Sequence, residues 1–172
     1  PDFGSNPGGM ITTARKTGNG WLLNGAKMWL TNGSMADIAV VWAQTGEIGD
    51  RNGIRGFIVP TDLPGFTARD QKGKLSLLAS DTSELVFEDV ELPENALLPR
   101  SSGLRDPLGC LTQARYGIAW GTVGAAMACY HEALSYAKER VMFDGPIAGK
   151  QLQQARLAEM ITQITQGQLL AL

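Results

Sequence analysis

The chain has 172 residues, of which 44% are hydrophobic and 19% are charged. This is the composition of a globular protein that can bury a core, and the length suits one ordinary domain or two small ones. A formal net charge of −2 gives no reason to expect nucleic acid or an anionic membrane surface as a partner. No apolar run reaches the roughly 18 residues of a membrane-spanning helix, so we also expect no membrane span.

Residues 1–100 alternate short apolar runs with turn residues, which is typical of β-strands. We predict strands at residues 10–16, 20–24, 26–31, 38–45, 55–60, 67–71 and 83–91. Their spacing indicates an antiparallel β-barrel or β-sandwich. The run at 38–43 is apolar throughout, so we expect a central strand covered on both faces. The run at 86–92 alternates, so we expect one solvated face there.

Residues 20–33 (GWLLNGAKMWLTNG) contain the strongest local signal. Asn24-Gly25 favours a type I′ turn, which predicts a two-stranded hairpin. Its second arm ends with Trp29 and Thr31, which would lie on the same side of a regular strand because side chains alternate. Trp29 is therefore either a core tryptophan or an aromatic face that stacks on a planar ligand, with Thr31 as a hydrogen-bonding partner.

Residues after Pro107 follow a helical pattern. Apolar residues recur every three or four positions from Leu108 to Tyr136, and a second helix is predicted from about Ile147 to the end. The glycines Gly117, Gly121 and Gly124 would weaken the first helix unless another backbone packs closely there. Two helices cannot bury their own apolar stripes, so partners must come from other chain segments or another subunit. We expect a β-domain at 1–100 and a helical region at 101–172.

Chemistry-bearing residues are few. The two cysteines, Cys110 and Cys129, indicate buried thiols in a reducing compartment, and one histidine, His131, gives no basis for a metal site. Arg115 lies on the apolar stripe of the first helix and needs a carboxylate, a phosphate or solvent. Arg140, in the last helical turn, is either a structural cap or a ligand contact. No carboxylate stands out as a catalytic base.

Several motifs in order resemble the acyl-CoA dehydrogenase family, and within it the glutaryl-CoA dehydrogenase branch. The matching segments are PDFGSN at 1–6, NGAKMWLTN at 24–32, GKLSLLAS at 73–80, VELPENALLP at 90–99, ARYGIAWG at 114–121 and RVMFDGP at 140–146. The last segment departs from the family pattern, with Met142 for Gln or Thr and Asp144 for Gly. A carboxylate there would be unfavourable near a pyrophosphate.

The resemblance implies an α+β multidomain fragment of a longer protein: the family's middle β-domain, then two helices of an incomplete four-helix bundle. It implies FAD as cofactor and α,β-dehydrogenation of an acyl-CoA, with glutaryl-CoA decarboxylated to crotonyl-CoA and electrons passed to electron-transfer flavoprotein. It also implies a homodimer or homotetramer in the bacterial cytoplasm or the mitochondrial matrix. The catalytic base would lie beyond Leu172.

The same resemblance implies two sets of site residues. The expected flavin contacts are Gly4, Ser5, Trp29, Leu30 and Thr31, together with Arg140, Phe143 and Gln151 reaching the cofactor of a neighbouring subunit. The expected acyl-CoA contacts are Ser5, Leu108, Gly109, Cys110, Leu111, Thr112, Gln113, Ala114 and Arg115. Without the resemblance, the residues leave open a non-catalytic module that binds ligand or self-associates. An acyl-CoA dehydrogenase of different chain-length specificity is also possible.

Overall fold

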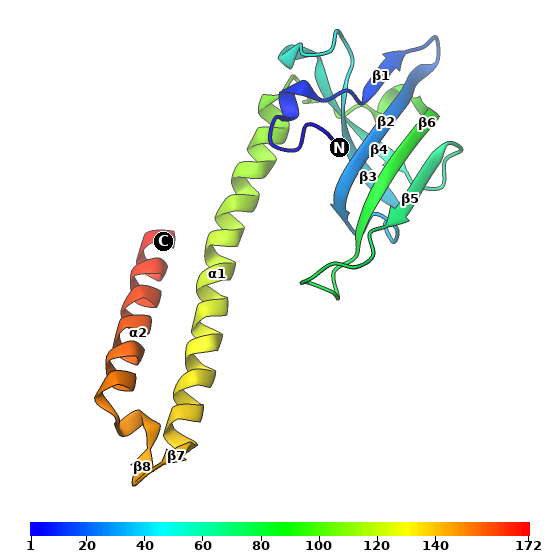
Figure 1. Cartoon of the computed structure of the whole chain (residues 1–172). Helices are drawn as coiled ribbons and strands as arrows, with labels where there is room; N and C mark the ends of the chain where they lie inside the picture. The colour runs from blue at the N-terminus through cyan, green and yellow to red at the C-terminus, as the bar shows by residue number, and fades with distance from the viewer. The chain divides into compact units, whose positions relative to one another are not determined.

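A six-stranded sheet organises the first part of the chain, in a computed structural model that describes residues 1–172 (Figure 1). Its strands are β1 (Thr13–Lys16), β2 (Gly20–Thr31), β3 (Ile38–Gln44), β4 (Ile54–Pro60), β5 (Phe66–Asp70) and β6 (Thr82–Pro93). They lie in the order β4-β3-β1-β2-β6-β5. Short 3₁₀ helices occur at η1 (Pro7–Gly9), η2 (Arg51–Gly53), η3 (Glu94–Ala96) and η4 (Ile147–Gly149).

The predicted β-domain followed by two helices is confirmed, but the sheet is mixed and does not close. β1 pairs in parallel with β3, through Thr13 and Gln44, whereas every other pair of neighbouring strands in the sheet is antiparallel. β4 and β5 form the two ends of the strand order. Of the expected antiparallel barrel or sandwich, the closed barrel is therefore not formed, because no hydrogen-bonded ladder joins the two edge strands.

The core lies on one face of this sheet. Its fully buried side chains include Leu23, Phe57, Leu85 and Phe87, from β2, β4 and β6. Burial of such side chains supplies the main favourable free energy of folding. The other face of β3 is not covered: Ile38 and Val40 are 58% and 54% exposed. The prediction of a strand buried on both faces is therefore wrong. The alternation of β6, with one solvated face, is as predicted.

The predicted hairpin at Asn24-Gly25 is wrong, because β2 runs without a turn through both residues. Asn24 instead faces a bulge in β6, where Leu23 pairs with Val90 and Gly25 with Phe87. The Asn24 amide donates to the Asp89 carboxylate at 2.9 Å, and the Asp89 backbone N–H donates to the Asn24 side chain at 2.9 Å. The asparagine thus satisfies polar groups that the bulge removes from the ladder.

Gly25 is needed for close approach and not for a turn. A Cβ at this position would lie 2.8 Å from the Cα of Thr12, and the backbone φ of Gly25 is +134°. Thr12 is held there by its hydroxyl, which donates to the carbonyl of Ala26 at 3.0 Å. The glycine of the Asn24-Gly25 pair is therefore explained without a turn, because Thr12, just before β1, lies very close to β2 at this position.

Two helices make up most of the second part. The chain divides into compact units at residues 1–108 and 109–172, and the first helix, α1 (Arg105–Glu139), begins in the former. A small hairpin of β7 (Val141–Met142) and β8 (Gly145–Pro146) leads to α2 (Gln151–Ala171). The two helices run side by side (Figure 1). No helix combines the length and hydropathy of a bilayer-crossing segment.

The helices leave much of their apolar surface exposed. A Cβ added at Gly117, Gly121 or Gly124 would meet nothing within 4 Å, so no backbone of this chain occupies the expected groove. Gly167 of α2 is closer to α1, with a Cβ position 3.2 Å from the Val123 side chain. Cys110 and Cys129 are free and exposed, contrary to the predicted burial, because α2 covers only part of α1.

Replacing Gly25 by alanine should destabilise the first unit. The new methyl group meets the Thr12 backbone at 2.8 Å with φ at +134°, so we expect a loss of about 2–4 kcal/mol in the free energy of unfolding. Urea unfolding followed by tryptophan fluorescence measures the change. Gly18→Ala is the control, since its Cβ would meet nothing within 4 Å. Equal stability of the two variants would contradict the close-approach explanation.

Candidate functional site

The candidate site is a pocket beside the second half of β2. It has a volume of about 280 Å³ and is lined by Pro1, Phe3, Gly4, Pro7, Met10, Ile11, Thr12, Ala26, Lys27, Met28, Trp29 and Leu30. Most of these side chains are apolar, and Lys27 is the only charged side chain among them. Because ligand pockets usually measure about 300–1,000 Å³, this volume suits one ring system and not a whole dinucleotide.

A second bulge places Trp29 at this pocket. Lys27 pairs with Leu85 and Leu30 with Ser83, so Met28 and Trp29 together oppose the single residue Glu84. Trp29 has a left-handed backbone, with φ of 65°, and its side chain is 66% exposed. Such a conformation costs a non-glycine residue roughly 1–2 kcal/mol, and strained positions of this kind cluster at functional sites.

Because of the bulge, the side chains of Trp29 and Thr31 cannot be placed by simple strand alternation. Simple alternation applies to a regular strand, and the left-handed residue interrupts it. Leu30 packs against the core while its neighbours Trp29 and Thr31 are exposed. The indole is therefore no core side chain, which removes one of the two interpretations of Trp29.

The strand ends directly after Thr31. Asn32 has φ of 61°, and its carbonyl accepts from the backbone N–H of Ala36 at 2.9 Å. Gly33 follows because a Cβ there would lie 2.7 Å from the Cβ of Ser83. The Thr31 hydroxyl is exposed and makes no hydrogen bond within the chain. It is therefore available to a ligand.

The N-terminal loop also lines the pocket, through Pro1, Phe3, Gly4 and Pro7. The loop folds on itself, with the Asn6 N–H donating to the Phe3 carbonyl at 3.2 Å. Ser5 is exposed and lies in this loop, next to Gly4, but it does not line the pocket. Of the five flavin contacts predicted in the first unit, the pocket therefore brings together Gly4, Trp29 and Leu30.

Lys27 is a site residue that the sequence reasoning missed. Its ammonium donates only to the sulfur of Met10, at 3.8 Å, and it has no carboxylate partner. Burial in these apolar surroundings lowers the pKa of Lys27 to about 8, because the charged form is poorly solvated. A lysine within the otherwise apolar run at 26–30 was the signal that could have found it.

The acyl-CoA residues predicted on α1, from Leu108 to Arg115, form no pocket of their own in the second unit. Leu108 alone lines a separate cavity of about 460 Å³, in the first unit, together with Arg51, Asn52, Ser102, Gly103, Leu104 and Arg105. Arg115 was expected to need a carboxylate, a phosphate or solvent. It is exposed and makes no ion pair, so in this chain its guanidinium faces solvent.

Arg140, Phe143 and Gln151 lie around the β7–β8 hairpin of the second unit. Arg140 directly follows α1, and its carbonyl accepts from the Ile147 N–H at 2.9 Å. Phe143 is 93% exposed, and the Lys150 ammonium lies 5.9 Å from its ring centre. Lys150 also donates to Asp144 at 2.7 Å, which lowers the pKa of that carboxyl. The Asp144 carboxylate is therefore already engaged by a cation.

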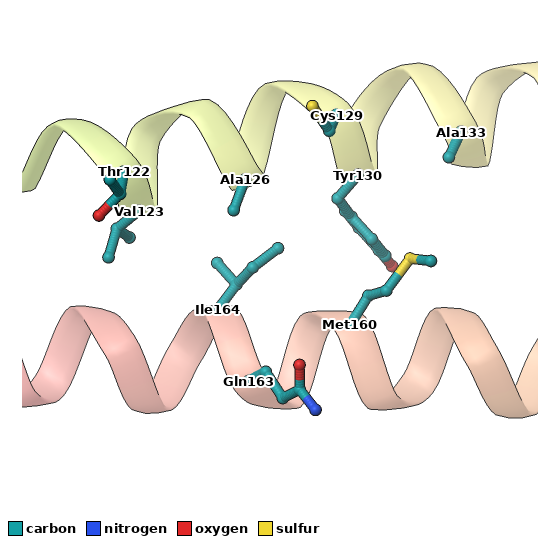
Figure 2. A pocket seen from close by; sticks show the side chains of 9 residues that line it. All are labelled: Thr122, Val123, Ala126, Cys129, Tyr130, Ala133, Met160, Gln163 and Ile164. Carbon is teal, nitrogen blue, oxygen red and sulfur yellow. The ribbon is translucent and has the colours of Figure 1, made fainter.

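A larger pocket of about 520 Å³ lies between α1 and α2 and contains none of the predicted site residues (Figure 2). Figure 2 shows Val123 and Tyr130 of α1 facing Ile164 and Met160 of α2. No charged side chain lines it. This is a groove between packed helices, and its polar lining groups are the hydroxyls of Thr122 and Tyr130, the Cys129 thiol and the Gln163 amide.

Replacing Lys27 by methionine should stabilise the first unit at neutral pH. The pKa of Lys27 is about 8 in the folded chain and 10.5 ordinarily, so the unfolded chain binds more protons between pH 8 and 10.5. Wild-type stability should rise with pH through this window, and the advantage of Lys27→Met, up to about 3 kcal/mol at pH 7, should shrink accordingly. Urea unfolding at pH 7 and pH 10 measures this, with exposed Lys138→Met as control. An advantage independent of pH would refute the explanation.

Comparison with known proteins assigns the chain to a family. The family described as "Acyl-CoA dehydrogenase, middle domain" matches residues 1–90, and "Acyl-CoA dehydrogenase, C-terminal domain" matches residues 101–172. An acyl-CoA dehydrogenase of Bacillus subtilis is 42% identical over 163 residues, which are 94% of this chain and 43% of that protein. The human mitochondrial short-chain specific acyl-CoA dehydrogenase is 36% identical, with 99% of this chain and 42% of that protein covered.

A solved structure agrees with this assignment. The glutaryl-CoA dehydrogenase of Mycobacterium smegmatis in complex with FADH2 is 53% identical and superposes with a TM-score of 0.93, covering 99% of this chain and 43% of that one. The chain thus spans less than half the length of these relatives. With both family descriptions matched in order along its length, the chain belongs to the acyl-CoA dehydrogenase family.

Proposed function

We propose that these residues belong to an FAD-dependent acyl-CoA dehydrogenase that oxidises and decarboxylates glutaryl-CoA to crotonyl-CoA. The observation that carries this proposal is the exposed Trp29 at an apolar pocket, in a chain 53% identical to a glutaryl-CoA dehydrogenase solved with FADH2. The proposed domain division is a middle β-domain at 1–100 and the beginning of the C-terminal helical domain at 101–172. Electron-transfer flavoprotein is the proposed electron acceptor, and the cytoplasm or mitochondrial matrix the proposed location.

The residues of the pocket fit a flavin ring. An exposed indole, apolar walls and a volume of about 280 Å³ suit a planar aromatic ring system. Trp29 and Leu30 would hold the ring, the Thr31 hydroxyl would donate to it, and Gly4 and Ser5 would contact it from the N-terminal loop. Bound FAD supplies the hydride acceptor for α,β-dehydrogenation, while the protein orients it and excludes water.

A second set of FAD contacts is proposed at Arg140, Phe143 and Gln151, which would reach the cofactor of a neighbouring subunit in a homodimer or homotetramer. Arg140 and Phe143 are exposed, as such a contact requires. The Lys150–Asp144 ion pair supports this assignment, because it offsets the carboxylate that would otherwise repel a pyrophosphate.

The acyl-CoA contacts are proposed at Ser5 and along Leu108–Arg115. The exposed guanidinium of Arg115, with no ion pair in this chain, suits a phosphate or adenine of the coenzyme. The catalytic carboxylate is proposed to lie beyond Leu172, so the 172 residues would not turn over substrate by themselves. The alternative is an acyl-CoA dehydrogenase of different chain-length specificity, such as the human short-chain enzyme, to which this chain is 36% identical.

A second candidate function is self-association without catalysis. Exposed apolar residues on the helices favour it, among them Ile118, Tyr136, Leu152, Leu169 and Leu170. Sedimentation of the 172-residue chain decides it: a clean monomer would count against this candidate, since apolar surface of this extent favours association.

The whole protein should be yellow and should bleach on addition of glutaryl-CoA. Flavin absorbance reports bound FAD, and bleaching without any added electron acceptor reports reduction by substrate. Trp29→Ala should weaken FAD binding about tenfold, since loss of an aromatic contact costs roughly 1.4 kcal/mol. Met35→Ala, at another exposed apolar side chain, is the control. A colourless protein that binds no added FAD would refute the proposal.

Turnover with a series of acyl-CoA substrates tests the substrate class. Glutaryl-CoA should give the highest kcat/KM and release CO₂, whereas a preference for butyryl-CoA without CO₂ would favour the short-chain alternative. Arg115→Met should raise KM about tenfold with little change in kcat, because a charge-assisted contact to the coenzyme is lost in ground and transition states alike. Arg156→Met on α2 is the control, as an exposed arginine outside the proposed contacts.

A further inference from the structure

Lys27 is a cation for which the chain provides no adequate partner. It is the only charged side chain that lines the pocket beside Trp29. Its one hydrogen bond goes to the Met10 sulfur at 3.8 Å, and thioether sulfur is a weak acceptor. The nearby Thr12 hydroxyl is committed as a donor to the Ala26 carbonyl. The pocket thus contains an ammonium group whose two further N–H donors have no acceptor within the chain.

Such a group is unfavourable in isolation. Apolar walls deprive the ammonium of solvation, and buried charges are normally paired. The same strand position could hold a methionine, which would pack against these walls without any desolvation cost. A lysine here is therefore accounted for if the occupant of the pocket presents an acceptor or a negative charge to Lys27.

The surroundings restrict what that occupant can be. A phosphate site usually offers several donors, from backbone N–H groups or arginines, whereas the side chains lining this pocket are one lysine, Thr12 with its hydroxyl committed to Ala26, and otherwise apolar groups. An exposed indole and a volume of about 280 Å³ suit a flat ring. The chemistry that matches both is an electron-accepting heterocycle with acceptor atoms, which gains negative charge on reduction.

Resting on the proposed function, we infer that Lys27 contacts the flavin ring held at Trp29 and favours its reduced, more negative form. Positive charge beside the ring is one of the means by which a protein tunes flavin electronics. Lys27 is then a cofactor contact that sets the reduction potential. The competing explanation is that Lys27 faces an acceptor from polypeptide outside these 172 residues.

The test is the midpoint potential of the flavin in the whole protein, measured by reductive titration against a reference dye without substrate. Lys27→Met should lower the potential by about 30 mV or more, which corresponds to a tenfold weaker preference for the reduced flavin in a two-electron couple. Lys27→Arg keeps the positive charge, so its preference for the reduced flavin should stay within threefold of the wild-type preference. Lys27→Gln replaces the methionine variant if that variant does not fold.

Lys72→Met is the matched control, because Lys72 is exposed and already paired with Asp70 at 2.8 Å. The flavin potential of this variant should equal that of the wild type. A wild-type potential in Lys27→Met or Lys27→Gln would overturn the inference, whatever the thermal stability of the variant. That result leaves the proposed function intact, since the flavin is bound. A wild-type protein that binds no FAD overturns both together.

Discussion

Strands β2 and β6 pair over 12 residues each, and two bulges interrupt that pairing. The first, at Glu88 and Asp89, is held by two hydrogen bonds to the Asn24 side chain. The second, at Met28 and Trp29, turns an aromatic residue out of the sheet. Because β1 and β5 pair with these two strands, the order of the sheet and the position of the candidate site both depend on this ladder.

The ladder also explains why an exposed tryptophan and a partly buried lysine occur next to each other. Side chains of the core face, such as Leu85 and Phe87, anchor β6 against the opposite residues of β2. Packing on that side holds Trp29 in a left-handed conformation that it would not adopt alone. Core packing thus stabilises the strained backbone of Trp29, while the Trp29 indole and the Lys27 ammonium line the pocket.

The second unit is organised on a different principle. α1 is 35 residues long, yet Ala137 is its only buried hydrophobic residue in that unit, and Ile164 is the only one of α2. A helix pair gains most of its stability from packing of its apolar faces. This unit therefore has much apolar surface left to pack against other helices, and its glycines on α1 leave room for them.

The sequence by itself determined the strand and helix content, since apolar periodicity reports local structure, and ordered motifs determined the family. It did not determine the Asn24-Gly25 segment, whose turn preference lost to pairing with β6 along the whole strand. Nor did it determine the exposure of Trp29, the closeness of Thr12 to Gly25 or the isolation of Lys27. These features depend on the register, that is, on which residues lie opposite one another on neighbouring strands. A bulge of one residue changes this register without any change in local composition.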